Sequence, residues 1–386
     1  MKDKISVFKN LIDKNIIHKN RNNKHINNKN INNSKQTRLF IFDLLKALSI
    51  VAVVSYHSIF VPQSTYTPHI QTLEILFSPL RFCVPIFLTI SFFLLERHLD
   101  IYKDQSLKLL LKKRMNRLLI PTCFWFAIAF ILKLCNGKSI GSLIPTISQG
   151  TIFTGSYYLL IILQLIPLFI CCRKWFKKDK NLYTTILLQG LIFLSLYILS
   201  FAPVGQKYIE FLKIIDRPLI IYWFVYIALG ILIYRNFAWI KQKSINLKIY
   251  QKLFLILINV TTFMVEYQLI LKTHSNSIQP FDYASFSCIL SIPTTFLCCS
   301  SLTSDFFWKP LNKLIKLLSV YSLGIFCING IISQIFLSLG DKLISQHSFS
   351  LIEILTIKIL GWIILLSVSL GLSIILKNLG LKRVVC

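Results

Sequence analysis

Long apolar runs recur along the chain from Phe40 onward, and each is close to the roughly 20 residues that a helix needs to cross a bilayer. Short segments rich in Lys and Arg separate many of these runs. The pattern predicts an all-α, polytopic membrane protein. Its ten expected transmembrane helices lie at residues 40–60, 78–96, 118–135, 155–172, 182–202, 218–234, 253–271, 284–303, 317–338 and 352–376.

The first 38 residues have a different composition. Asn, Lys and Ile dominate much of this stretch, and ten of its residues are Lys or Arg. It lacks the apolar run and the cleavage site of a signal peptide. We expect residues 1–38 to form a disordered, basic cytoplasmic tail that anionic headgroups attract, although mutational drift toward these residue types would leave the same pattern. Residues 39–376 would then be the membrane domain, and residues 377–386 a short basic cytoplasmic tail.

Composition and charge agree with a membrane location. The chain has 54% apolar and 15% charged residues, and its formal net charge is +28. A soluble nucleic-acid-binding protein can be this basic, but it would not carry 30 Phe residues and a mean hydropathy of +0.63. We therefore expect a lipid bilayer, and no nucleic acid, as a partner.

The distribution of Lys and Arg predicts the orientation. With the N-terminal tail in the cytoplasm, the cytoplasmic segments hold 33 of these residues, and Lys46 and Arg81 lie inside helices. Cytoplasmic loops of membrane proteins carry such an excess, so both termini are expected in the cytoplasm. The opposite face has only eight, namely Lys133, Lys138, Lys207, Lys213, Arg217, Lys272, Lys342 and Lys358.

Common signatures of metal and phosphate chemistry are missing from the sequence. The ten cysteines follow no zinc-binding or disulfide spacing, and they are best interpreted as small apolar residues in or beside helices. No Gly-rich phosphate loop and no Gly-x-Ser-x-Gly elbow is present. We expect no metal site and no permanently bound cofactor.

The first predicted helix carries three ionisable residues, Asp43, Lys46 and His57, which are costly in lipid and point to a function. Lys46 and His57 are 11 residues apart, so they lie on one face of the helix and about 16 Å apart along its axis. Asp43 stands three residues before Lys46, which predicts an ion pair between them. Histidine is suited to proton exchange near neutral pH, although a lone His near a helix end is more often an interfacial residue.

Five motifs in order resemble those of the membrane acyltransferase 3 family, over about residues 38 to 376. They are Lys46-x10-His57, the stretch Val84-Pro85-Ile86-Phe87 through Ser91 to Leu95, Arg114-Met115-Asn116-Arg117 followed by Pro121, Tyr157-Tyr158-Leu159, and Tyr321-Ser322-Leu323-Gly324-Ile325-Phe326. The ten expected helices and the cytoplasmic termini agree with this resemblance.

The resemblance implies an integral-membrane O-acyltransferase of the cell membrane. Such an enzyme moves an acyl group, expected to be acetyl, from acyl-CoA to a hydroxyl of a glycan or another envelope-linked acceptor. It makes His57 the candidate catalytic base, with Lys46, Arg114 and Arg117 binding the donor. A base is needed because a hydroxyl is a poor nucleophile until its proton is removed. Taken alone, Arg114 and Arg117 would be an ordinary basic flank of a helix.

Three further residues are expected to support the site. Asp43 accompanies Lys46, Arg81 begins the second predicted helix, and Glu266 lies near the end of the seventh. Glu266 could contact the acceptor, but pairing with Lys272 or His274 would explain it equally well. The chain also departs from the family pattern at two positions, because Phe92 replaces a common Gly and Asn329 replaces a frequent His.

Two other functions compete with acyl transfer. A transporter or flippase for a lipid-linked or small anionic substrate would favour inverted repeats and helices broken at matched positions, and neither is evident. A membrane scaffold without enzymatic activity would leave Asp43, Lys46 and His57 without a purpose. The acyl group, the acceptor, the group that orients His57 and the oligomeric state cannot be derived from the sequence.

Overall fold

The computed structural model describes residues 39–101, 106–201, 217–273, 281–344 and 347–386, with positions 205, 207, 208 and 211. The predicted tail at residues 1–38 lies outside the described residues. The larger unit of the chain, Phe40–Cys386, is helical throughout its described elements. Its longer helices are α2 (Phe40–Tyr56), α4 (Cys83–Ile101), α5 (Leu107–Cys135), α7 (Tyr157–Cys171), α9 (Asp179–Phe201), α11 (Val225–Arg235), α13 (Ile249–Thr273), α14 (Phe286–Cys299), α16 (Ser322–Ile344) and α17 (Leu351–Asn378).

The remaining helical segments lie between or after these. They are η2 (Gln63–His69), α3 (Ile70–Phe77), η3 (Ser78–Phe82), α6 (Ile140–Ser148), α8 (Arg173–Phe176), η5 (Ile220–Tyr222), α12 (Phe237–Asn246), η6 (Ser304–Phe306), α15 (Lys309–Val320) and α18 (Lys382–Val385). Several of them lie between the predicted transmembrane helices. One of them, α15, is one residue longer than α11.

Each of the ten predicted spans overlaps one long helix, but the lengths differ. Six spans in the described part of the chain are long and apolar enough to cross a membrane, and a seventh results if η5 with α11 and the bent α12 is counted as one. These findings indicate a multi-pass membrane protein. Helices α2, α7, α11 and α14 have only 17, 15, 11 and 14 residues. The predicted ranges were too long at these helices because apolar residues continue into the loops that follow or precede them.

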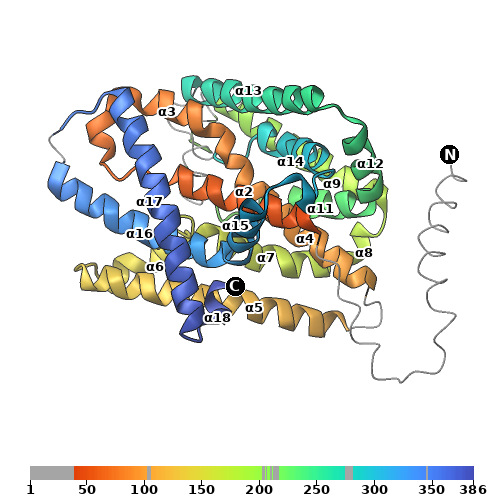
Figure 1. The fold of residues 1–386 in the computed structure, drawn as a ribbon, viewed down its shortest axis with the longest axis horizontal. Coiled ribbons are helices and arrows are strands. Elements are labelled where there is room, and N and C mark those ends of the chain that lie inside the picture. The colour runs from red at the N-terminus through yellow and green to blue at the C-terminus, as the bar shows by residue number, and fades with distance from the viewer. Residues whose placement is uncertain are drawn as a thin grey trace, which may run out of the picture. The chain divides into compact units, whose positions relative to one another are not determined.

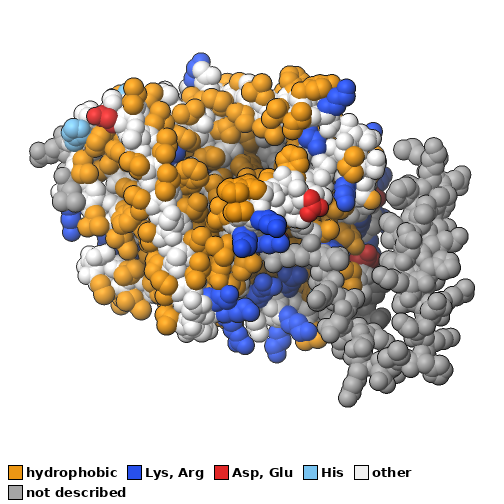
Figure 2. All heavy atoms as spheres, in the orientation of Figure 1, with side chains coloured by type: hydrophobic (Ala, Val, Ile, Leu, Met, Phe, Trp, Pro, Cys, Tyr) orange, Lys and Arg blue, Asp and Glu red, His pale blue; other side chains and the backbone are white. Residues whose placement is uncertain are grey.

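Buried helices lie inside a set of exposed apolar ones. Eleven of the 17 residues of α2 and nine of the 11 residues of α11 are buried, and both helices pack against α4. Phe42 and Phe93 join α2 to α4 with ring centroids 4.5 Å apart. Figure 1 shows α2 between α13 and α5, which lie at opposite edges of the unit. Figure 2 shows hydrophobic side chains over most of the visible face of the unit, as a surface in contact with lipid requires.

The C-terminal residues pack against the membrane helices. Helix α17 ends at Asn378, and α18 then turns back onto α5. The indole Nε1 of Trp125 donates a hydrogen bond to the backbone oxygen of Val384 over 2.9 Å. The side chain of Val385 is fully buried. The segment predicted as a short basic tail therefore includes a helix that covers part of α5.

Close backbone contacts hold the segment that follows α2. The backbone oxygen of Ser58 lies against Gly361 of α17, and that of Phe60 lies against Gly340 of α16. A Cβ atom at either glycine would overlap these oxygens. The rings of Phe60 and Phe336 are also in edge contact, with centroids 4.8 Å apart. The position of His57, at the end of α2, therefore depends on small residues in two distant helices.

We predict that Gly361→Ala displaces the segment after α2 and lowers stability by about 1–3 kcal/mol, because the new methyl group cannot fit against the backbone of Ser58. Gly371→Ala on the same helix is the matched control, since its Cβ would meet open space. A helical Gly→Ala change of that kind is expected to be neutral or to stabilise by up to about 1 kcal/mol. Thermal unfolding of both variants in detergent measures the difference, and equal midpoints would contradict the prediction.

Candidate functional site

A first cavity contains all three residues predicted to bind the donor. Lys46 of α2 and Arg114 and Arg117 of α5 line a space of about 250 Å³, which we call the Lys46 cavity. Ser91 of α4 and Tyr158 of α7 contribute polar groups to its wall, and Cys386 at the C-terminus lies beside them. Three cations converging on one cavity form an environment suited to an anion with several charges.

Asp43 is anchored in the interior next to this cavity. Its carboxylate is buried, and Oδ1 accepts a hydrogen bond of 2.6 Å from the hydroxyl of Ser319 in α15. Ser319 itself lines the Lys46 cavity. Asp43 therefore connects α2 to α15 at the edge of the cavity. The expected ion pair between Asp43 and Lys46 stays a prediction.

A second cavity lies at the other end of α2. It has a volume of about 320 Å³, and we call it the His57 cavity. His57 shares its wall with Glu74 of α3 and with Lys358 of α17. The backbone N–H of His57 donates a hydrogen bond to the oxygen of Val53 over 3.3 Å, so the last turn of α2 fixes the backbone position of His57. The structure thus separates His57 from Lys46, Arg114 and Arg117.

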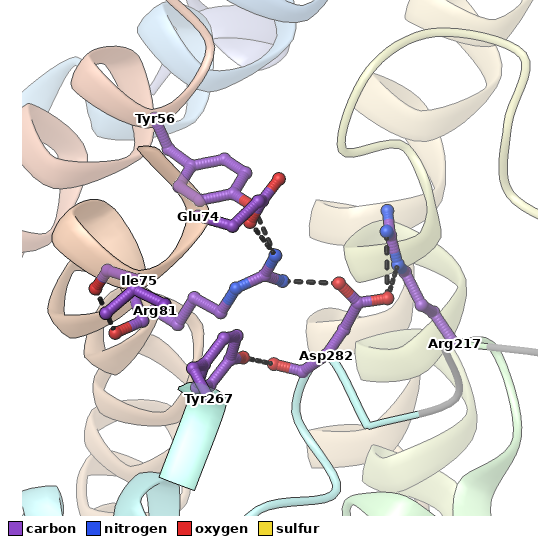
Figure 3. A network of polar contacts seen from close by, with 8 residues as sticks. Tyr56, Glu74, Ile75, Arg81, Arg217, Tyr267 and Asp282 are labelled. Atoms are coloured by element: carbon purple, nitrogen blue, oxygen red, sulfur yellow. Dashed lines mark hydrogen bonds and ion pairs between the residues drawn. The ribbon is translucent and has the colours of Figure 1, made fainter. Parts of the chain in front are cut away.

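Arg81 lies at the centre of a buried polar network beside His57 (Figure 3). Its guanidinium donates to Asp282 Oδ1 over 2.5 Å and pairs with Glu74 Oε2 over 3.3 Å. The same group donates to the hydroxyl of Tyr56, which in turn donates to Glu74 over 2.9 Å. Tyr56 precedes His57 in the chain, and their rings are in edge contact with centroids 5.4 Å apart. Arg81 therefore fixes the end of α2 rather than touching the cavity itself.

Asp282 is held between two arginines. Its second oxygen, Oδ2, accepts from Arg217 Nε over 3.0 Å, and Figure 3 shows Arg81 and Arg217 on either side of the carboxylate. Burial alone would raise the pKa of the Asp282 carboxyl, but the Arg217 and Arg81 guanidiniums hold the pKa below its usual value. Asp282 consequently stays ionised and balances charge beside the His57 cavity.

Glu266 has a different position. Its carboxylate accepts from the backbone N–H groups of Phe286 and Ser287, each over 2.8 Å, at the N-terminus of α14. The hydroxyl of Tyr197 donates to it over 2.6 Å. It lines neither the Lys46 cavity nor the His57 cavity. No ion pair joins it to Lys272 among the described residues, and His274 lies outside them. Its observed contacts are those of a carboxylate that caps α14.

The two departures from the family pattern are both buried. Phe92 is fully buried between α4 and α11, where Gly230 leaves room for it, and it also lines the Lys46 cavity. Asn329 in α16 is fully buried too, and neither atom of its amide has a hydrogen-bond partner. A buried amide without hydrogen-bond partners lowers the stability of the folded protein, which suggests that Asn329 has a role other than stability.

Two residues of the His57 cavity were missed by the sequence analysis. Lys358 was counted only as a cation near the end of the last helix, although a cation seven residues into an apolar helix is itself a signal. Glu74 lies in α3, where the sequence offers no motif around it. Only the folded chain brings both residues to the cavity that His57 lines.

One comparison with known proteins gives a match. A family model described as an acyltransferase domain matches residues 39–377, nearly the whole chain. The other comparisons find no curated protein and no solved structure that is similar to the chain.

We predict that Asp282→Asn destabilises the protein by about 3 kcal/mol, because it leaves the buried guanidinium of Arg81 and the partly exposed guanidinium of Arg217 without their shared carboxylate. Asp179→Asn is the matched control, since Asp179 is 62% exposed in its pair with Arg235 and should cost less than about 1 kcal/mol. Thermal unfolding in detergent measures both losses, and equal losses would contradict the prediction.

The difference in stability between wild type and Asp282→Asn should also depend on pH. Because folding lowers the pKa of Asp282, its stabilisation is complete above the unfolded pKa of about 3.9 and disappears as pH falls through the lower folded value. The gap in unfolding midpoint between wild type and Asp282→Asn is therefore expected to be constant near neutral pH and to close in acid. A gap that widens in acid would have the wrong sign.

Proposed function

This chain belongs to the acyltransferase 3 family and is a membrane-embedded acyltransferase, and we propose that it moves an acyl group, expected to be acetyl, from acyl-CoA to a hydroxyl of a glycan or another envelope-linked acceptor. One observation carries the proposal. The residues suited to bind the donor gather in the Lys46 cavity, while the candidate base lines a separate cavity at the other end of the same helix.

The Lys46 cavity suits the phosphates of coenzyme A. Arg114 and Arg117 are separated by about one helical turn, and their guanidiniums can bind phosphate oxygens through paired hydrogen bonds. Lys46 of α2 supplies a third positive charge to the same cavity. The proposal places this cavity on the cytoplasmic side, which is where acyl-CoA is available. It includes ten transmembrane helices, both termini in the cytoplasm and a location in the cell membrane.

The distance between the two cavities fits the shape of the donor. Lys46 and His57 are about 16 Å apart along α2, and coenzyme A separates its phosphates from its thioester by a long, thin pantetheine arm. Two buried polar side chains without hydrogen-bond partners lie at intermediate positions, Ser49 on α2 and Asn329 on α16. Helices α2 and α16 pack against each other. We expect the two amides of the arm to bond to Ser49 and Asn329 when the arm enters between these helices.

His57 would act as the general base. Its imidazole takes the proton of the acceptor hydroxyl as the oxygen attacks the thioester carbonyl. The tetrahedral intermediate then collapses, the carbon–sulfur bond breaks, and the proton passes from His57 to the departing thiolate. The products are the acylated acceptor and coenzyme A with a free thiol. No metal and no permanently bound cofactor takes part in this proposal.

We predict that His57→Ala lowers the rate of acyl transfer from acyl-CoA by at least about a hundredfold, since a positioned base contributes on that order. Purified protein in nanodiscs allows the measurement of both acyl transfer and donor binding. Donor binding should survive in His57→Ala, because His57 lies outside the Lys46 cavity. Loss of donor binding together with activity would instead indicate a folding defect, and unchanged activity would contradict the role of His57.

Changes at the arginines should act on the donor alone. We predict that Arg114→Gln with Arg117→Gln raises KM for acyl-CoA by about tenfold or more, with a smaller change in kcat. Lys112→Gln with Lys113→Gln is the control, because these exposed neighbours carry the same charge but do not line the cavity. Equal effects from the two double variants would show that general charge, rather than the cavity, attracts the donor.

Asn329→Leu tests the path of the pantetheine arm. The change removes a buried amide without partners, so thermal stability should be kept or should rise. At the same time KM for acyl-CoA is expected to rise about threefold to tenfold through a lost hydrogen bond. A stable variant with an unchanged KM would contradict the proposed path.

A further inference from the structure

A third cavity adjoins the His57 cavity. It has a volume of about 660 Å³ and is lined by residues of α5, α6 and α16 and of the segment that joins α5 to α6. Three lysines lie on its wall, namely Lys133, Lys138 and Lys342. We call it the lysine cavity. No ion pair among the described residues includes any of these three lysines.

Helix α16 separates the lysine cavity from the His57 cavity. Ser333 and Leu337 line the His57 cavity, whereas their neighbours Gln334 and Ser338 line the lysine cavity. The two cavities therefore occupy adjacent faces of the same stretch of α16. One extended ligand could contact both cavities.

Lys358 gives the His57 cavity a positive charge of its own. Its side chain is 3% exposed, its Nζ donates to the backbone oxygen of Ser55, and it lies 4.2 Å from the centre of the Phe77 ring. No ion pair among the described residues includes it. Glu74 lines the same cavity, but its carboxylate already bonds to Tyr56 and Arg81. A buried cation without a carboxylate partner is costly unless an anion enters the cavity.

These four lysines also stand out against the distribution of charge. The sequence places only eight Lys and Arg residues at the His57 end of the helices, as expected for the non-cytoplasmic face. Half of the eight line these two cavities. The general depletion of cations from this face makes their concentration in two adjoining cavities a specific feature.

We infer that the acceptor is an anionic, hydroxyl-bearing polymer, a glycan or polyol with carboxylate or phosphate groups, which binds across the lysine cavity and the His57 cavity. The inference rests on the proposed function, since it identifies the acceptor of that reaction. One anionic group of the polymer pairs with Lys358, which brings a neighbouring hydroxyl to His57. Further anionic groups along the polymer pair with Lys133, Lys138 and Lys342. A neutral glycan would leave all four lysines without an anionic partner among the described residues.

Equilibrium binding to the full chain in nanodiscs of uncharged lipid tests this inference. Three probes of equal length are compared: an oligogalacturonate, an oligomer of glycerol phosphate, and a neutral maltooligosaccharide. At least one anionic probe is expected to bind about tenfold more tightly than the neutral one, and its affinity should fall as salt rises. The tighter of the two anionic probes tells whether the acceptor carries carboxylates or phosphates. Equal affinity for the neutral and both anionic probes would overturn the inference.

Two variants and a control locate the binding. Lys133→Gln, Lys138→Gln and Lys342→Gln together should weaken the anionic probe about tenfold, because each exposed pair is worth up to about 1 kcal/mol. Lys358→Met should weaken it by at least as much, and Lys358→Arg, which keeps the charge, should restore part of the loss. The control removes three exposed lysines of α15, Lys309, Lys313 and Lys316, and should leave affinity unchanged. Equal losses in the control and the triple variant would overturn the assignment to the lysine cavity.

Donor turnover separates this inference from the proposed function. Hydrolysis of acyl-CoA without an acceptor is measured in wild type and in the triple lysine variant, and both should retain it. Anion binding without any binding or turnover of acyl-CoA would contradict the proposed function and leave the anion site standing. Turnover of acyl-CoA with no preference for an anionic probe would support the proposed function and contradict the anionic acceptor.

Discussion

The burial of α2 constrains the rest of the molecule, because this helix carries ionisable residues at both ends and most of its residues are buried against other helices. A charge in such a place is tolerated only with partners. At one end, Ser319 of α15 donates to Asp43. At the other, Arg81 reaches Tyr56, and Lys358 bonds to the oxygen of Ser55. The packing of α15, η3 and α17 around α2 therefore satisfies buried polar groups as well as burying apolar area.

This arrangement explains why so much of the polar chemistry lies beside His57 without touching the His57 cavity. Asp282 joins Arg81 to Arg217, so a charge network of low net charge forms behind the end of α2. Removing Arg81 or Asp282, the two buried members, would leave a buried charge with less compensation, which costs more than the intact network contributes. The network therefore stabilises the position of the end of α2. Lys358 lines the His57 cavity and has no paired carboxylate among the described residues.

Much of this architecture could be predicted from the sequence. The apolar runs predict the helices, and helix geometry places Lys46 and His57 near opposite ends of the first one. The gathering of Lys46, Arg114 and Arg117 in one cavity also agrees with their expected common role. Other features depend on contacts between distant segments. Glu266 looked like a candidate for binding because a carboxylate near a span is rare, but its backbone partners at α14 lie about 20 residues further along the chain. Glu74 and Lys358 line one cavity although most of the chain separates them in sequence.

The separation of the two cavities limits how acyl transfer can occur. If Arg114, Arg117 and His57 shared one cavity, the donor and the acceptor could meet there without further change. In the proposed function one end of α2 binds the donor phosphates and the other carries His57, so the thioester would have to reach along the helix while the phosphates stay in the Lys46 cavity. The same proposal gives a role to Ser49 and Asn329, whose buried polar groups lack hydrogen-bond partners and therefore lower the stability of the protein. If the amides of the bound donor form hydrogen bonds to these two side chains, the cost of burying them is offset. The free protein would then be less stable than one with apolar residues at both positions, but it would bind the pantetheine arm.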